Sequence, residues 1–179
     1  MKHIFISGRY GIGKSTLIEK LISLYPEKAI FGFYTKKEPM LSDGISKVYI
    51  HDANHSQRSY TADNCIGACS DQGGKANISV FETTGLSMLM KIPAQCLVVM
   101  DELGLFETKA CTFCSKVLDV LEGGNLVIGA VKGADSSFLH AVKTHPRVAL
   151  YQMTDENRDT LFDTIIKEME VSQENEKNS

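Results

Sequence analysis

Arginine is scarce in this sequence, whose 179 residues include only Arg9, Arg58, Arg147 and Arg158. Basic residues as a whole are outnumbered, with 19 Lys and Arg against 22 Asp and Glu and a net charge of −3. The chain therefore lacks the basic field that holds duplex nucleic acid non-specifically. We expect no nucleic-acid partner, and the sequence leaves any protein partner undefined.

Long apolar runs are also missing. No stretch approaches the roughly 18 apolar residues of a membrane span. The apolar residues 4–6 are too few for a secretory signal. We therefore expect a cytoplasmic protein without a membrane partner.

The cysteines are few and odd in number. The five residues Cys65, Cys69, Cys96, Cys111 and Cys114 are expected to be free thiols in a reducing compartment. The spacings of Cys65 to Cys69 and of Cys111 to Cys114 invite a zinc site. However, zinc pairs usually occupy tight turns, and the second pair falls inside a predicted helix, so buried thiols are the favoured interpretation.

The length suits one domain, which we predict over residues 1–170, with a disordered polar tail at 171–179. Apolar runs at 4–6, 97–100 and 126–128 predict buried strands. Helical periodicity predicts amphipathic helices over residues 14–24, 106–122 and 155–169, the last with Thr154 as its N-cap. This alternation predicts an α/β fold with a mostly parallel sheet flanked by helices.

Residues 29–82 follow another pattern. Residues 29–34, 46–50 and 76–81 are strand-like, and turn-forming residues occur at 42–44 and 73–74. Such a series predicts an antiparallel β excursion after the first helix, with a hairpin or loop over residues 39–75.

The residues after the first strand carry a phosphate-binding pattern. Residues 8–15 match G-x-x-x-x-G-K-[ST] between a predicted strand and a predicted helix. Glycines let the backbone approach phosphate closely, and successive N–H groups then bind it at the helix N-terminus. Lys14 would reach the β- and γ-phosphates, and the Ser15 hydroxyl would ligate Mg²⁺. We expect nucleotide contacts from Gly8, Arg9, Tyr10, Gly11, Ile12, Gly13, Lys14, Ser15 and Thr16.

A second acidic pattern ends the strand at 97–100. Asp101 would hold Mg²⁺ through its water shell and contact the nucleotide site. Glu102 would orient and deprotonate an attacking water. Glu107 is either a further catalytic or coupling carboxylate or a first-turn acid that the helix dipole favours. Residues 101–104 also fit the D-x-x-G of switch GTPases, but no N-K-x-D guanine-reading motif follows.

Two cations outside the phosphate loop are candidates for the site. Arg158 could contact the base or the phosphates, or could form an ion pair with Asp155 or Asp101. Lys132 ends a predicted strand and is a candidate sensor of the γ-phosphate.

Four blocks of this sequence resemble the small nucleoside-triphosphatases, also called cancer-related nucleoside-triphosphatases. They are residues 8–16 (G-x-x-G-x-G-K-[ST]-T), 32–35 (G-F-x-T), 101–107 (D-E-[IL]-G-x-x-E) and 154–158 (T-x-E-N-R). The resemblance implies a RecA/AAA-like P-loop core and Mg²⁺-dependent hydrolysis of ATP, GTP and other triphosphates to diphosphate and phosphate. Tyr10 replaces the usual proline, and Lys36-Lys37 stand where the family continues with acidic residues and an arginine.

Two other functions remain open. A small-molecule or nucleotide kinase shares the phosphate loop but needs an acceptor site, which often uses several arginines. A non-enzymatic nucleotide switch would order residues 39–75 against a partner. Because few arginines are available, we expect slow turnover by the isolated chain.

Overall fold

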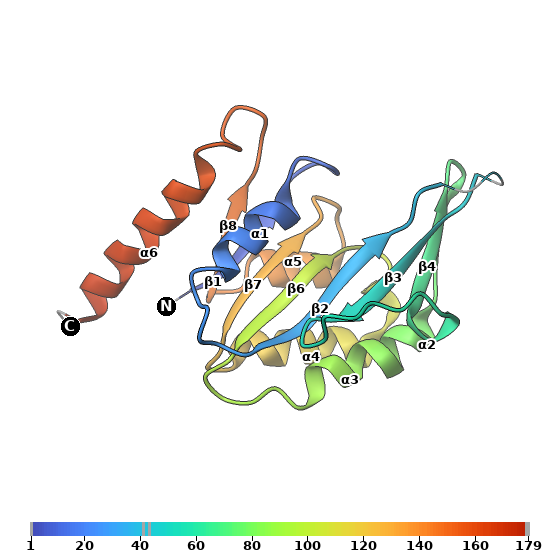
Figure 1. The fold of residues 1–179 in the computed structure, drawn as a ribbon, viewed down its shortest axis with the longest axis horizontal. Coiled ribbons are helices and arrows are strands. Elements are labelled where there is room, and N and C mark those ends of the chain that lie inside the picture. The colour runs from blue at the N-terminus through green and yellow to red at the C-terminus, as the bar shows by residue number, and fades with distance from the viewer. Residues whose placement is uncertain (1, 41, 43, 178–179) are drawn as a thin grey trace.

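The computed structural model describes residues 2–40, 42 and 44–177. Within that part of the chain, eight strands form one sheet in the order β5-β4-β3-β2-β6-β7-β1-β8 (Figure 1). The strands are β1 (His3–Ser7), β2 (Ile30–Lys37), β3 (Ser46–Asp52), β4 (Cys65–Ser70), β5 (Gly73–Ala76), β6 (Leu97–Leu103), β7 (Leu126–Val131) and β8 (Val148–Gln152).

Six helices are described along the chain. They are α1 (Lys14–Ile22), α2 (Ile78–Val80), α3 (Leu86–Met90), α4 (Cys111–Glu122), α5 (Ser137–Lys143) and α6 (Leu161–Lys177). Shorter turns are η1 (Ala62–Asn64), the π-helical η2 (Phe81–Gly85) and the 3-10 turn η3 (Glu107–Lys109). No helix of the described residues is long and apolar enough to cross a membrane.

The sheet confirms the predicted α/β architecture. Strands β2, β6, β7, β1 and β8 are parallel, and β3, β4 and β5 extend the β2 edge with antiparallel pairing. The three strands predicted from apolar runs are β1, β6 and β7. They lie in the middle of the sheet and are almost wholly buried, which is why they are apolar on both faces.

Two apolar layers hold helices against the sheet. On one face, Phe113 of α4 packs against Phe33 and Phe81, with ring centroids 5.6 and 5.2 Å apart. On the other face, Leu17 of α1 and Ile165 of α6 pack in a separate cluster. The result is a sheet between helical layers, with α6 at the β8 end (Figure 1).

The predicted strand at residues 76–81 is wrong. The chain is helical from Ile78, because Ile78, Phe81, Gly85 and Leu89 recur at helical spacing toward the core. The turn predicted at 73–74 is also displaced, since Gly73 begins β5. The Phe106 ring packs so closely on Gly74 that a Cβ there would lie 2.6 Å from Phe106 Cε1.

Other boundaries differ from those predicted. The last helix begins at Leu161 rather than near 155, because Asn157 Oδ1 accepts the Thr154 N–H at 2.8 Å and closes a turn. Thr154 is therefore not an N-cap. The segment predicted as a disordered tail from 171 continues α6 to Lys177, since its Glu, Gln and Lys residues favour helix and no Gly or Pro stops it. Residues 178–179 lie outside the described part.

Candidate active site

The phosphate loop joins β1 to α1 at the carboxyl edge of the sheet. Gly13 immediately precedes α1 in the left-handed conformation (φ 112, ψ 16), and its carbonyl accepts the Leu17 N–H at 3.0 Å. Within the phosphate loop, six predicted nucleotide contacts besides Lys14 line one cavity of about 800 Å³: Gly8, Tyr10, Gly11, Gly13, Ser15 and Thr16. Ile12 instead packs into the core, 5% exposed.

Lys14 lies at the floor of this cavity, 8% exposed. Its Nζ donates to Gly8 O at 2.9 Å and to Arg9 O at 3.1 Å. The same Nζ is 3.1 Å from Glu102 Oε1. The ammonium group is therefore held between the phosphate loop and the acidic end of β6.

Asp101 and Ser15 face each other across the start of α1. Burial raises the pKa of Asp101 to about 6, and the nearby Ser15 hydroxyl opposes this rise by favouring the ionised carboxylate. A hydroxyl beside a buried carboxylate is an oxygen donor set that suits a hard divalent cation.

Glu102 has polar contacts at its backbone and at its carboxylate. Its backbone N–H donates to Thr35 Oγ1 of β2 at 3.2 Å. Its carboxylate lies between two lysines, with Oε1 3.1 Å from Lys14 Nζ and Oε2 4.0 Å from Lys132 Nζ. Thr35 has no role in the sequence prediction, although it belongs to the 32–35 block, because a hydroxyl on a strand carries no chemical signal by itself.

Glu107 is buried at the cavity wall, 3% exposed. Its carboxylate accepts the Gly104 N–H, and its carbonyl accepts the Cys114 thiol at 3.1 Å. Burial raises the pKa of Glu107 to about 7. The side chain thus closes the turn over residues 104–107 and supports the chain that follows Glu102.

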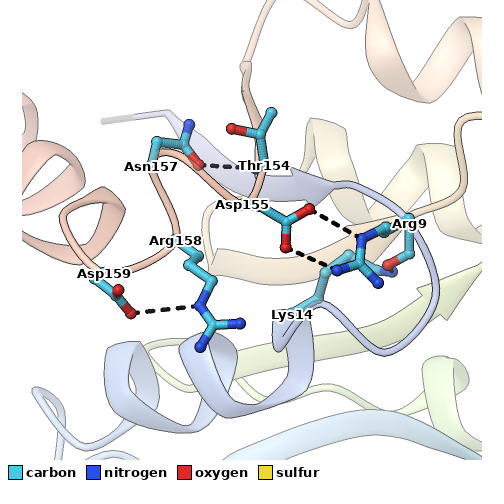
Figure 2. A network of polar contacts seen from close by, with 7 residues as sticks. All are labelled: Arg9, Lys14, Thr154, Asp155, Asn157, Arg158 and Asp159. Atoms are coloured by element: carbon cyan, nitrogen blue, oxygen red, sulfur yellow. Dashed lines mark hydrogen bonds and ion pairs between the residues drawn. The ribbon is translucent and has the colours of Figure 1, made fainter.

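Two predicted contacts, Arg9 and Arg158, lie outside the residues that line the cavity. Arg9 Nη2 and Nε contact the two Asp155 oxygens at 2.7 and 3.3 Å (Figure 2). This hydrogen bonding lowers the pKa of Asp155. Arg158 Nε faces Asp159 Oδ1 at 3.5 Å. The ion pair of Arg158 is thus with Asp159 rather than with Asp155 or Asp101, although the charge of Arg158 also helps to lower the pKa of Asp155. Its nucleotide contact stays a prediction.

The cavity has two dissimilar halves. One half is polar and consists of the phosphate loop together with Asp101, Glu102 and the lysines that line the cavity. The other half is lined largely by apolar side chains of β3, β4 and the segments after β6 and β7: Val48, Ile66, Cys69, Leu105, Phe106 and Ala134. These residues escaped the sequence prediction because they come from separate segments without a shared motif.

A strand, a phosphate loop, a helix and a second parallel strand of the same sheet with two acids near its end are the features of a P-loop NTPase. Comparison with protein families gives the narrower assignment. The model of the family described as NTPase matches residues 3–166, and the chain belongs to this family.

Curated relatives span nearly the same length. The chain is 26% identical to a cancer-related nucleoside-triphosphatase homolog of Bos taurus, over 96% of this chain and 98% of that protein. It is 28% identical to the nucleoside-triphosphatase THEP1 of Metallosphaera sedula, over 93% and 86% of the respective chains. The crystal structure of THEP1 from Aquifex aeolicus shares the fold, with a TM-score of 0.68, 19% identity, and coverage of 91% of this chain and 96% of that one.

Proposed function

We propose that this chain hydrolyses nucleoside triphosphates to nucleoside diphosphate and phosphate, with Mg²⁺ and with broad tolerance of the base. One observation carries the proposal: the Glu102 carboxylate lies within 4.0 Å of both Lys14 Nζ and Lys132 Nζ, opposite the phosphate loop in one cavity. A carboxylate placed there can accept a proton from water beside the terminal phosphate.

Mg²⁺ suits the donors on β6 and α1. The Ser15 hydroxyl and the Asp101 carboxylate would hold it, with the remaining positions left to water and phosphate oxygens. Burial raises the pKa of Asp101 to about 6, and a bound divalent cation would lower it by stabilising the ionised carboxylate. When bound, the ion neutralises charge on the β- and γ-phosphates.

The reaction itself is a transfer of the γ-phosphoryl group to water. The water oxygen bonds to the γ-phosphorus, its proton passes to Glu102, and the bond from the γ-phosphorus to the bridging oxygen breaks. The diphosphate leaves, with Lys14 and the loop N–H groups beside its developing charge. Thr35 positions Glu102 for this step through the hydrogen bond to its backbone N–H.

Broad base tolerance rests on two observations. The sequence lacks an N-K-x-D guanine-reading motif, and the family resemblance implies several bases. The first experiment is therefore phosphate release from ATP, GTP, CTP and UTP, with and without Mg²⁺. We expect release from each triphosphate with Mg²⁺ and loss of release when EDTA removes it. Release from one triphosphate alone would contradict the tolerance, and undiminished release in EDTA would contradict the metal dependence.

The Glu102→Gln variant tests the proposed base. Gln keeps the size and a hydrogen-bonding oxygen but cannot accept the proton, so we expect kcat to fall by about 10²–10⁴-fold. Triphosphate affinity should remain close to that of the parent. The matched control is Glu27→Gln, an exposed carboxylate outside the cavity. Equal turnover in Glu102→Gln and the parent would remove Glu102 as the base.

A kinase remains the second candidate, and the apolar half of the cavity favours it. The apolar side chains of Val48, Ile66 and Phe106 supply no group for phosphoryl transfer, whereas a small acceptor could pack against them. The scarcity of arginine argues against an acceptor pocket. A screen of acceptors with labelled triphosphate decides between the two functions. Transfer that exceeds phosphate release would replace hydrolysis by kinase activity.

A further inference from the structure

The four arginines of this chain all have places outside the cavity. Arg9 pairs with Asp155, Arg158 faces Asp159, and Arg147 donates to Glu122 O at 2.6 Å. Arg58 lies over the Tyr34 ring, 5.3 Å from its centroid. In the residues that the structure describes, none of the four lines the cavity. Positive charge beyond the phosphate loop must therefore come from lysine.

Three lysines besides Lys14 line the cavity, namely Lys36, Lys37 and Lys132. Lys37 Nζ lies over the Tyr10 ring, 5.7 Å from its centroid. Lys132 Nζ is 4.0 Å from Glu102 Oε2, and Lys14 Nζ is 3.1 Å from Glu102 Oε1. The two ammonium groups thus approach different oxygens of one carboxylate.

Contacts with the chain at the end of β6 set the direction of the Lys132 side chain. The Lys132 backbone N–H donates to Leu103 O at 2.9 Å. Its side chain passes over Gly104, where a Cβ would lie only 3.0 Å from Lys132 Cδ. Gly104 in turn donates its N–H to the buried Glu107 carboxylate. The aliphatic part of the Lys132 side chain therefore lies against Gly104. The side chain as a whole is 53% exposed, so its ammonium group has room to move with a phosphoryl group.

We infer that Lys132 is a catalytic residue that contacts the γ-phosphoryl group during its transfer to water, in the role that an arginine fills in other P-loop enzymes. This inference rests on the proposed hydrolysis. A cation beside the transferring phosphoryl stabilises the charge that spreads over its oxygens. Since Lys132 belongs to the same chain as the phosphate loop, hydrolysis needs no arginine from a partner.

The test compares turnover with affinity in Lys132→Met, Lys132→Arg and the control Lys109→Met, an exposed lysine outside the cavity. We expect Lys132→Met to lower kcat by about 10²–10³-fold, as the loss of one transition-state donor does. KM for MgATP and the affinity for ADP should stay within about threefold of the parent. Lys132→Arg should restore part of kcat, and Lys109→Met should match the parent.

A transition-state analogue separates direct contact from an effect through Glu102. ADP with aluminium fluoride mimics the transferring phosphoryl group, and we expect Lys132→Met to weaken its affinity by at least about tenfold more than that of ADP alone. The same loss should appear in the Glu102→Gln background. If it disappears there, Lys132 only positions Glu102 and the inference is wrong.

Each remaining result is also decisive. Parent-like kcat in Lys132→Met would overturn the inference, and loss of ADP binding would assign Lys132 to folding or ground-state binding instead. If the parent itself releases no phosphate, the proposed hydrolysis fails. The selective loss of the fluoride complex would then still report contact between Lys132 and the terminal phosphoryl position.

Discussion

Glu102 and Glu107 belong to one short stretch of chain but have different surroundings. Glu102 is 16% exposed and faces two lysines. Glu107 is 3% exposed and accepts the N–H of Gly104. We propose proton transfer for Glu102 and support of the turn for Glu107, because of the two carboxylates it is that of Glu102 that faces Lys14 and Lys132.

The Glu107 carboxylate gives a pH-dependent test of stability. Burial raises its pKa from 4.5 to about 7, so the unfolded chain loses this proton at lower pH than the folded chain. Stability from this group is complete below about pH 4.5 and is lost as the pH rises through about 7. Glu107→Gln removes this term, and relative to the parent it should gain up to about 3 kcal/mol between pH 4.5 and 8.5.

Urea unfolding at both pH values measures that difference. Glu27→Gln, on an exposed carboxylate, should show no such change with pH. The raised pKa of Asp101 is common to the parent and the variant, so it cancels in the comparison. A stability gap between Glu107→Gln and the parent that stays constant from pH 4.5 to 8.5 would contradict the buried, proton-holding carboxylate.

The pairing of β2 with β6 brings Thr35 to Glu102, and Gly32 makes that pairing possible. Gly32 has φ +97, and a Cβ there would lie 2.1 Å from Val99 O. We expect Gly32→Ala to destabilise the fold by more than about 3 kcal/mol, since backbone of a central strand must shift. Gly73→Ala is the control, with φ +125 but no atom within 4 Å, and should cost about 1–2 kcal/mol.

Chemical denaturation followed by circular dichroism measures both glycine variants. A similar loss in the two would mean that backbone conformation alone explains the effect. In that case the close approach of β2 to Val99 would not be the feature that holds the acidic strand beside Thr35.

Elements with a local signal were predictable from the sequence. Strands β1, β6 and β7 are buried on both faces, so unbroken apolar runs mark them. The segment after β5 suits a strand locally because Ile78, Val80 and Phe81 are apolar, whereas the helical spacing of its buried residues continues past residue 81, and Phe81 packs on Phe113. Strand β8 has an alternating pattern of burial at the sheet edge and was not predicted.

At the scale of the whole molecule, some parts of the site have a local sequence signal and others do not. Residues 8–16 and 101–107 were predictable because contiguous motifs encode the phosphate loop and the acidic strand. The apolar half of the cavity was not, since β3 and β4 reach it only through long-range antiparallel pairing. The Arg9–Asp155 pair, which joins the phosphate loop to the chain after β8, likewise depends on the order of strands in the sheet.

The location of the arginines leads to an expectation for assembly. If Lys132 supplies the cation from within the chain, turnover per molecule should not depend on protein concentration. Slow turnover is expected, because a lysine presents a point charge where an arginine presents a planar fork. Specific activity that rises with concentration, and that Arg9→Ala or Arg158→Ala abolishes, would instead indicate an arginine supplied between copies.

The most direct test follows the oxygen of water through a single turnover of MgATP in H₂¹⁸O. We expect ¹⁸O in the released inorganic phosphate and none in ADP, because water attacks the γ-phosphorus and the bridging oxygen leaves with the diphosphate. The Glu102→Gln protein should form this labelled phosphate at least about 100-fold more slowly. Label in ADP, or a γ-phosphoryl group recovered on a molecule other than water, would contradict hydrolysis at this site.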